Sequence, residues 1–507
     1  MSKAALVRKL KKYHKWPGIF VALFALLFAL SGIFLNHRNL ISNVDISRKL
    51  MPPGYQYKNW NLAGVRSSLT VGDDSILIYG NIGVWMTTKS LSGFTDWNYG
   101  FPDGIDNRKI YSIVKYGQCL VAGTHFGLFV NTLKPFKWIQ VSMPDGEERI
   151  SDLAVKGDTL LILTRNILYR TNDLLHIEHI KLPPPVGYDH KAGLFLTLWE
   201  LHSGELFGFV GKLFVDILGI VLIFLSLTGL LHFLFPKWIS RLKKQGRSYA
   251  SPLSVKKWNL KWHNRIGYIF IVFLLANTTA GMFLRPPLLI PIVSTQIGIL
   301  PHTHLDTDNP WHDKLRRIIW NQGMNRYVVY TSDGFFYANQ KLNNDLVPVP
   351  NQPPVSIMGC NTFESLDVER YLVGSFSGLF IWYPTSGMVL DYFSGKQAES
   401  PHGIGRPVGQ NMVAGYLNNF NDRNYWIDYN RGIIATDGGA PFPEMPETIL
   451  KQTPISLWNA ALEVHTGRIF EHLIGPFYLL YVPLMGLTIM IVLISGIILW
   501  WISYRKK

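Results

Sequence analysis

The sequence predicts a membrane α-helical bundle of four spans, built from a duplicated two-helix unit, joined to an all-β part outside the membrane. Three observations lead to this class. Four apolar runs are each long enough to cross a bilayer, which takes about 20 helical residues. Basic residues gather in short segments beside these runs. The two long segments between the runs carry short strands and turns at the spacing of β-propeller blades.

The apolar runs lie at residues 17–36, 206–235, 266–284 and 473–501. The first run has a basic start, as a secretory signal would. It continues through Leu30-Ser31-Gly32 without a small-residue cleavage site, and its apolar core is too long for a signal. We therefore expect a retained span.

Charge indicates the orientation of the spans. Residues 1–15 carry six Lys/Arg and residues 236–265 carry nine, with no acid in either segment, and the chain ends Arg505-Lys506-Lys507. Short basic segments stay in the cytoplasm. We therefore expect a protein of the bacterial inner membrane, with both termini and the linker on the cytoplasmic side. The net charge of +15 then reflects topology, and no nucleic-acid partner is expected.

This orientation divides the chain into seven segments. They are a cytoplasmic N-terminus with the first span (1–37), a periplasmic β-rich half (38–198), the second span (199–236), a basic cytoplasmic linker (237–262), the third span (263–285), a second periplasmic β-rich half (286–460), and the fourth span with a cytoplasmic tail (461–507).

The membrane part is an internal duplication. "YHKWPGIFVALFALLFALSGIFL" from Tyr13 matches "WHNRIGYIFIVFLLANTTAGMFL" from Trp262, and "WELHSGELFGFVG" from Trp199 matches "LEVHTGRIFEHLIGP" from Leu462. The second and fourth spans also match near their ends, where "LTGLL" corresponds to "ISGII". The glycines in these repeats allow helices or a flat ligand to approach closely.

Histidines repeat with the helices. His14 corresponds to His263 at the cytoplasmic entrance of a span, and His202 corresponds to His465 at the outer entrance. One interpretation is that they are interfacial residues that cap helices. The other follows from chemistry, because neutral imidazole is the usual ligand of haem iron and two facing helices can bind one iron axially. An inner set (His14, His232, His263) and an outer set (His37, His202, His465, His472) then suit two haems across the membrane.

A depth estimate leaves the ligand pairing open. If the second span is one helix centred near Val221, His202 lies about 28 Å outward, beyond the edge of a hydrocarbon core about 30 Å thick. His37 then competes as the outer ligand, and His232 competes on the inside. Asp216 lies within the same span, where it would relay protons, bond to a ligand histidine, or face a polar interior.

Both outer segments repeat a strand–turn–strand unit. The turns lie at Gly83, Gly127 and Asn166 in the first segment and at Gly334, Gly378 and Gly432 in the second. Spacings near 40–50 residues are typical of propeller blades, so we expect a six-bladed β-propeller assembled from two loops. Two separate β-rich domains are the alternative. The only two cysteines, Cys119 and Cys360, form either a disulfide or two free thiols.

The span motifs "HKWPGIF…LSGIFLNHR", "LHSGELFG…LTGLLHF", "WHNRIGY…TAGMF" and "VHTGRIF…ISGIILWW" resemble the PepSY-associated transmembrane helix family, which includes iron-regulated inner-membrane proteins and ferric-siderophore reductases. The resemblance implies four helices, two b-type haems with bis-histidine ligation, and electron transfer outward to ferric iron held by a siderophore. His14, His202, His263 and His465 match the histidines of the family motif. The family usually carries small PepSY modules outside the membrane, and only "YPTSGMVLDYFSG" from Tyr383 has that character.

Two functions follow as expectations. The first is a dihaem reductase of a periplasmic acceptor, a ferric siderophore, that serves iron uptake. Because the chain has no nucleotide-binding motif, its electrons would come from quinol or from a cytoplasmic flavin reductase. The second is a non-enzymatic membrane-anchored propeller, a scaffold or sensor that binds a periplasmic partner. The second function gives the repeated histidines no role.

Overall fold

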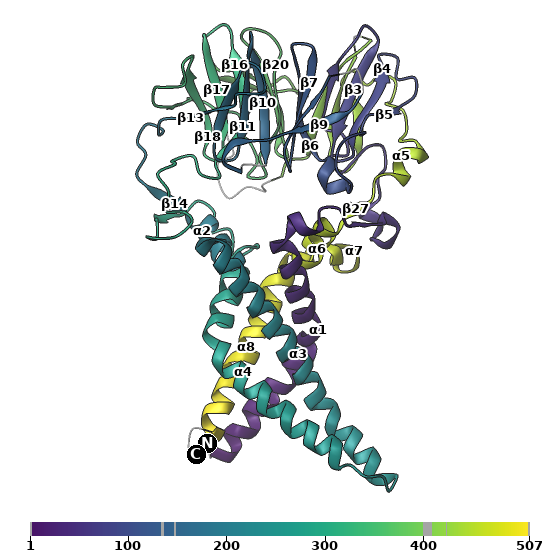
Figure 1. The fold of residues 1–507 in the computed structure, drawn as a ribbon, viewed down its shortest axis with the longest axis vertical. Helices are drawn as coiled ribbons and strands as arrows, with labels where there is room; N and C mark the ends of the chain where they lie inside the picture. Colours follow the sequence, from purple (N-terminus) through teal and green to yellow (C-terminus); the bar gives the residue numbers. More distant parts are fainter. Residues whose placement is uncertain (1–2, 133–135, 147–148, 399–407, 422, 505–507) are drawn as a thin grey trace. The chain divides into compact units, whose positions relative to one another are not determined.

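The computed structural model describes residues 3–132, 136–146, 149–398, 408–421 and 423–504, so the basic tail Arg505-Lys506-Lys507 lies outside the described residues (Figure 1). The chain forms two compact units. The helical unit comprises Met1–Ile41, His190–Asp306 and Leu457–Lys507. The β unit comprises Ser42–Asp189 and Thr307–Ser456. Each unit is therefore built from segments that are far apart in the sequence.

Four long helices form the body of the helical unit. They are α1 (Lys3–Asn36), α3 (Gly208–Lys244), α4 (Ala250–Phe283) and α8 (Tyr481–Tyr504). Helix α1 contacts α3 and α8, and α4 contacts the same two helices, so the four close into a bundle. Val21, Leu218, Leu274 and Ile489 supply one buried apolar side chain from each helix.

The outward faces of this bundle remain apolar. Leu23, Ile220 and Val272 are 61%, 59% and 68% exposed, which suits contact with lipid chains rather than water. Each of four segments is long and apolar enough to cross a membrane, by length and composition. The prediction of four membrane helices in contact with lipid is confirmed.

The second and fourth spans begin with breaks in the helix. Helix α2 (Leu194–Ser203) ends at Gly204, before η6 (Glu205–Phe207) and α3. Helix α6 (Leu457–His465) ends before Gly467, and η7 (Arg468–Phe470), α7 (Glu471–Ile474) and η8 (Gly475–Leu480) lead into α8. Gly204 and Gly467 have φ values of 84° and 76°, where a side chain is strained. The assumption of one unbroken helix around Val221 was therefore wrong, and the depth estimated for His202 does not hold.

Residues 237–262, expected to be a linker, are mostly helical. Helix α3 continues to Lys244 and α4 begins at Ala250, so the turn between them is short. Its glycine, Gly246, has φ 64°. Lys, Arg and Leu favour helix wherever no packing opposes it, and the prediction of a basic linker did not address its secondary structure. In the same unit β14 (Lys191–Gly193) pairs with β15 (Gln296–Gly298).

The β unit contains six small antiparallel sheets, each numbered in chain order. The first three are β2 (Ser67–Thr70), β3 (Ser75–Gly80), β4 (Gly83–Thr88) and β5 (Thr95–Asp96); β6 (Ile110–Tyr116), β7 (Cys119–Thr124), β8 (Leu128–Asn131) and β9 (Trp138–Val141); and β10 (Ile150–Lys156), β11 (Thr159–Thr164), β12 (Leu168–Thr171) and β13 (Glu178–Ile180).

The other three sheets come from the second long segment. They are β16 (Leu315–Asn321), β17 (Arg326–Thr331), β18 (Gly334–Asn339) and β19 (Val347–Pro348); β20 (Cys360–Ser365), β21 (Tyr371–Ser375), β22 (Gly378–Tyr383) and β23 (Met388–Asp391); and β24 (Val413–Phe420), β25 (Arg423–Asp428) and β26 (Gly432–Ala435). A further short pair joins β1 (Asp45–Ile46) to β27 (Ile455–Ser456).

The repeat found in the sequence is the central hairpin of each sheet. Gly83, for example, pairs with Gly80 at the turn from β3 to β4 and has φ 88°. The central strands are apolar and buried because each is covered on both faces by neighbouring sheets. The expected β-rich class is confirmed. Cys119 and Cys360 are free thiols.

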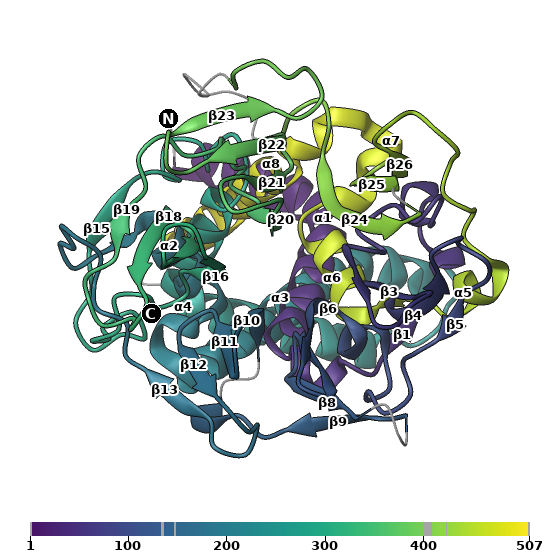
Figure 2. The ribbon, with the colours of Figure 1, turned by 90° about the horizontal axis from the view of Figure 1, so that it is seen from above.

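The first strands of the six sheets contact one another in a closed order. β2 contacts β6, β6 contacts β10, β10 contacts β16, β16 contacts β20, β20 contacts β24, and β24 contacts β2. Figure 2 shows these sheets side by side around a common centre. The beginning and the end of the β unit are thus neighbours.

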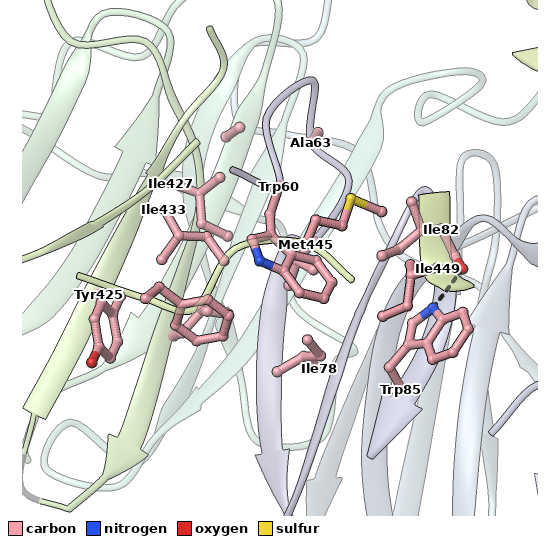
Figure 3. Packing of buried hydrophobic residues seen from close by; sticks show 14 of the residues in the cluster. Trp60, Ala63, Ile78, Ile82, Trp85, Tyr425, Ile427, Ile433, Met445 and Ile449 are labelled. Atoms are coloured by element: carbon pink, nitrogen blue, oxygen red, sulfur yellow. Dashed lines mark hydrogen bonds between the residues drawn. The ribbon is translucent and has the colours of Figure 1, made fainter. Parts of the chain in front are cut away.

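Residues near Trp60 join the first and last sheets. The Ile433 N–H donates to the Asn59 carbonyl at 3.0 Å, and the Leu62 N–H donates to the Tyr429 carbonyl at 2.7 Å. The fully buried Trp60 packs in one apolar cluster with residues of β3, β4, β25 and β26, as Figure 3 shows. This turn therefore links the first sheet to the last through backbone hydrogen bonds and a shared apolar cluster.

Candidate functional site

Two pairs of histidines face each other inside the helical unit. The inner pair is His14 of α1 and His263 of α4, whose ring centroids are 6.2 Å apart with planes at 78°. The outer pair is His202 at the end of α2 and His465 at the end of α6, with centroids 6.0 Å apart and planes at 51°. The four histidines of the duplicated motif are thus brought together two by two, each with its counterpart in the repeat.

The inner pair is held through Nδ1. His14 Nδ1 lies 3.0 Å from the Val492 carbonyl and 3.3 Å from Ser495 Oγ, both on α8. A carbonyl only accepts, so Nδ1 of His14 carries the proton. Nε2 is then left with its lone pair, as a metal ligand requires.

A hydroxyl group performs the same task for His263. Its Nδ1 lies 2.8 Å from Thr228 Oγ1 on α3. Thr228 Oγ1 donates its own proton to the Phe224 carbonyl at 2.6 Å. Because that proton is already used, the hydroxyl accepts from Nδ1, and His263 also presents a free Nε2.

The outer pair has matching supports. His202 Nδ1 donates to the Asn277 carbonyl at 3.0 Å, and the Asn277 side chain donates back to the His202 carbonyl at 2.9 Å. His465 Nδ1 lies 3.0 Å from Ser31 Oγ and 3.2 Å from the Phe28 carbonyl. Among the described residues, no hydrogen bond forms at Nε2 of any of the four paired histidines.

Each paired imidazole lies against a glycine of a neighbouring helix. A Cβ at these glycines would come within 2.9 Å of His14 (Gly496), 3.6 Å of His263 (Gly229), 2.6 Å of His202 (Gly281) and 3.3 Å of His465 (Gly32). The residue before each glycine is Ser495, Thr228, Ala280 or Ser31. One arrangement, which we call the glycine seat, therefore occurs four times.

The glycine seats were visible in the sequence but not interpreted. The repeats "LSG", "LTG", "TAG" and "ISG" were recognised as places of close approach, without the hydroxyl being assigned as the support of a histidine. Three of the four seats have such a hydroxyl, and the fourth relies on the Asn277 carbonyl alone. Ser31, Thr228 and Ser495 are the functional residues that sequence reasoning missed.

His37 and His232 lie outside the two pairs. His37 Nε2 is 2.7 Å from Asp216 Oδ2, and Asn36 donates to the other oxygen of that carboxylate at 3.2 Å. Asp216 is therefore bonded to His37 and not to a paired histidine. His232 lies on α3, three residues after Gly229, and its Nδ1 is buried without a hydrogen-bond partner in the described part of the chain.

His472, the remaining member of the outer set, is exposed on α7. Its Nδ1 lies 2.7 Å from the Ile469 carbonyl of the preceding turn. The side chain thus bonds within its own short segment and takes no part in the outer pair.

The two pairs are separated along the helices. His14 and the outer seat Gly32 are both on α1, and His263 and the outer seat Gly281 are both on α4. Each interval corresponds to about 27 Å at about 1.5 Å per residue. Phe28 lies between these depths, 5.6 Å from the His465 ring and 5.2 Å from the Tyr481 ring.

Solved structures resemble the chain only distantly. The extracellular domains of a hybrid two-component system and of a one-component system, both from B. thetaiotaomicron, share 14% identity with it at TM-scores of 0.35. The matches cover 72% and 80% of this chain and 30% and 34% of those chains, so this chain spans about a third of their length. The computationally designed Ika8 protein matches at 8% identity and TM-score 0.32, over 75% of this chain and 97% of its own. No curated protein matches the sequence.

The family comparison concerns the first half of the membrane part. The model of the PepSY-associated TM region matches residues 2–235, which contain α1, α2 and most of α3 with His14 and His202. The resemblance predicted from the span motifs is confirmed by this match. Over residues 2–235, just under half of its length, this membrane protein is similar to the PepSY-associated TM region.

Proposed function

We propose that the inner and outer pairs each hold one b-type haem and that the protein transfers electrons across the membrane. The observation that carries this proposal is the spacing of the paired rings, 6.2 Å and 6.0 Å between centroids. Two imidazoles that bind one metal ion through Nε2 at about 2.0 Å have centroids about 6.3 Å apart once the ring radius is added. Both pairs therefore match bis-histidine ligation.

The donor set also suits haem. Each pair offers two neutral imidazoles, and the nearby carboxylate Asp216 is bonded to His37. Two protein ligands complete the coordination of an iron whose other four positions are filled by a porphyrin. The Nδ1 hydrogen bonds fix the ring orientation and the tautomer, as partners of metal-binding histidines commonly do.

The separation of the pairs supports transfer across the bilayer. When bound, a haem iron carries one electron between its ferric and ferrous states. The pairs are about 27 Å apart along α1, close to the thickness of a hydrocarbon core of about 30 Å. The helices thus hold one pair near each end of the spans, where a donor and an acceptor on opposite sides would reach them.

The direction and the substrates follow from the family resemblance and from charge. We place both termini in the cytoplasm because the flanking segments are basic. Electrons would enter from quinol or a cytoplasmic flavin reductase and leave to a ferric siderophore in the periplasm. Reduction weakens the hold of hard oxygen donors on iron, which would serve iron uptake.

We further propose that the six sheets of the β unit are the blades of a β-propeller. In support, their first strands contact one another in a closed order from β2 to β24 and back. Backbone hydrogen bonds of Asn59 and Leu62 also join the start of the unit to its end. A density map of the purified protein tests this, since two separate groups of three sheets would contradict it.

The haem proposal is tested by the visible spectrum of the full chain purified from cells with ample haem. We expect a reduced-minus-oxidised b-type spectrum and two haems per chain. His14→Ala and His465→Ala should each remove one haem, because each opens a different pair. His472→Ala is the matched control, since this exposed histidine belongs to neither pair, and it should retain both haems.

Protein without haem under these conditions would overturn the proposal. It would favour the alternative of a non-enzymatic scaffold or sensor, which predicts no haem. Loss of haem in the His472→Ala control to the same degree as in His14→Ala would also contradict the assignment of ligands.

A further inference from the structure

The β unit contains a partly open cavity that is rich in arginine. Its volume is about 510 Å³, within the range of small-molecule sites. The lining includes Arg66, Arg149, Arg165, Arg316 and Arg317, together with the phenol group of Tyr111. No aspartate or glutamate belongs to the lining among the described residues.

These side chains converge because of where they lie on the sheets. Arg66 directly precedes β2, and Arg149 directly precedes β10. Arg316 and Arg317 are the second and third residues of β16, and Tyr111 is the second residue of β6. These five residues lie at or directly before the starts of first strands, which contact one another, whereas Arg165 directly follows β11. Positions far apart in the sequence thus meet at one end of these strands.

A repeated irregularity turns side chains toward the cavity. The register of the first and second strands shifts by one residue at Tyr111, Ser151, Arg316 and Asn361, each the second residue of a first strand. An extra residue of this kind leaves the ladder and is commonly found next to binding sites. All four of these residues line the cavity. Four different sheets therefore carry a β-bulge at the second residue of their first strand.

Two carboxylates balance only part of the positive charge. Asp152 Oδ2 lies 3.3 Å from Arg317 Nε. Asp313 lies 2.7 Å from Arg165 Nε and 3.8 Å from the Arg316 guanidinium. Five arginines thus share two paired acids.

The remaining acid nearby is bonded elsewhere. Burial raises the pKa of Glu364 to about 7, and its carboxyl group accepts from Ser67 Oγ and Asn418 Nδ2, both at 3.3 Å. Its charge interaction with Arg317 offsets part of the excess, but no ion pair joins it to a described arginine of the lining.

Arg66 and Arg149 form no ion pair with any described residue. The guanidinium groups of both lie near the face of Tyr111, at 5.7 Å and 5.9 Å from the ring centroid. Nε of Arg66 is buried and has no hydrogen-bond partner within the described chain. Nη2 of Arg66 reaches only the side-chain oxygen of Asn81, at 3.5 Å. A guanidinium group without a carboxylate partner keeps its charge for a ligand, so these two groups are the ones best placed to bind an anion.

Arg165 also experiences this excess of charge. Burial and the positive charges of Arg149 and Arg316 lower the pKa of Arg165 to about 9. Mutual repulsion of this kind is relieved when a negative group enters between the guanidinium groups.

We propose that this cavity binds a small molecule that carries two or more oxyanion groups, carboxylate or phosphate. Planar guanidinium groups bind both kinds of group with two parallel hydrogen bonds. Several arginines around one volume favour a ligand with more than one such group. The Ser151 hydroxyl lies in the same lining and adds a neutral donor. The inference stands apart from the haem proposal, since it depends only on the β unit.

Calorimetric titration of the full chain in detergent tests the inference, with citrate as the carboxylate probe and pyrophosphate as the phosphate probe. We expect saturable binding of at least one probe in 0.15 M salt. Citrate binding alone would assign a carboxylate ligand, and pyrophosphate binding alone would assign a phosphate ligand. Absence of binding for both probes would overturn the inference.

Variants assign the binding to this cavity. Arg66→Gln and Arg149→Gln should each weaken the affinity at least tenfold, because each removes a charged donor without a carboxylate partner. Arg149→Lys keeps the charge but loses the planar fork, so its affinity should lie between those of the wild type and Arg149→Gln. Thermal unfolding of each variant shows whether the fold is kept.

Arg370→Gln is the matched control. This arginine is half-exposed in a turn of the same unit, where its Nε lies 2.6 Å from Asp367. The affinity of this variant should equal that of the wild type. Equal affinities of Arg66→Gln, Arg149→Gln and Arg370→Gln would place the binding outside the cavity and refute the inference.

Discussion

The substitution Gly281→Ala gives the sharpest test of the glycine seats. The new Cβ would lie 2.6 Å from Cε1 and 2.9 Å from Nδ1 of His202, whereas carbon atoms in contact are about 3.5–4.0 Å apart. The imidazole must therefore move by roughly 1 Å, and a metal–ligand distance tolerates only about 0.2 Å. We expect the outer pair to lose its haem and the inner pair to keep its own.

Gly229→Ala is the matched control for this substitution. It adds the same methyl group to the same motif, but the Cβ would lie 3.6 Å from Cε1 of His263, an ordinary contact. In a helix, alanine is otherwise more favourable than glycine by about 1 kcal/mol, so a loss of haem would not reflect a weakened helix.

The haem content per chain and the reduced-minus-oxidised spectrum measure the outcome. Gly281→Ala should show about half of the wild-type haem absorbance, and Gly229→Ala should show all of it. Two haems with an unchanged spectrum in Gly281→Ala would refute the reasoning. Equal losses in both variants would also refute it, because the added Cβ crowds the imidazole only at Gly281.

Three further predictions address the histidine supports and the β unit. Thr228→Val removes the acceptor of His263 Nδ1, which makes the ligand less basic and should raise the reduction potential of the inner haem alone; a redox titration measures this, with the exposed Thr279→Val as control. Asp216→Asn should retain both haems, because Asp216 bonds to His37 and to no paired histidine, and a haem assay checks it. Trp60→Ala should destabilise the β unit by about 3–5 kcal/mol, since Trp60 is fully buried; denaturant unfolding measures this against the exposed Tyr99→Ala.

The sequence was informative where a pattern repeats along the chain. Apolar length gave the four membrane helices, and the glycine turns gave the β-rich class. The duplicated motif pointed to the same four histidines that the structure pairs. Helix breaks were not foreseen at Gly204 and Gly467, because a glycine within an apolar run equally suits close helix packing.

The arginine cavity could not be foreseen from the sequence. Arg66, Arg149 and Arg316 are separated by tens of residues or more, and none belongs to a motif. Only the contacts between first strands bring them together, and these contacts are tertiary. Each of these arginines lies at or directly before the start of a first strand. This shared position can be recognised only after the strands are known.

The glycine seats have a consequence for the two copies of the repeated unit. His14 and His202 lie in the first copy, and their seats Gly496 and Gly281 lie in the second. His263 and His465 lie in the second copy, and their seats are in the first. Each of the four paired histidines thus lies against a glycine of the opposite copy. The arrangement resembles domain swapping between two subunits.

Neither copy can complete a histidine pair by itself. A chain of half this length would have to assemble as a symmetric dimer, in which both subunits offer the same histidines and the same seats. When both copies lie in one chain, they are always present in equal numbers. Each copy can then acquire substitutions that the other copy lacks. Ala280, which stands where the other three seats have a hydroxyl, is one position where the copies have already diverged.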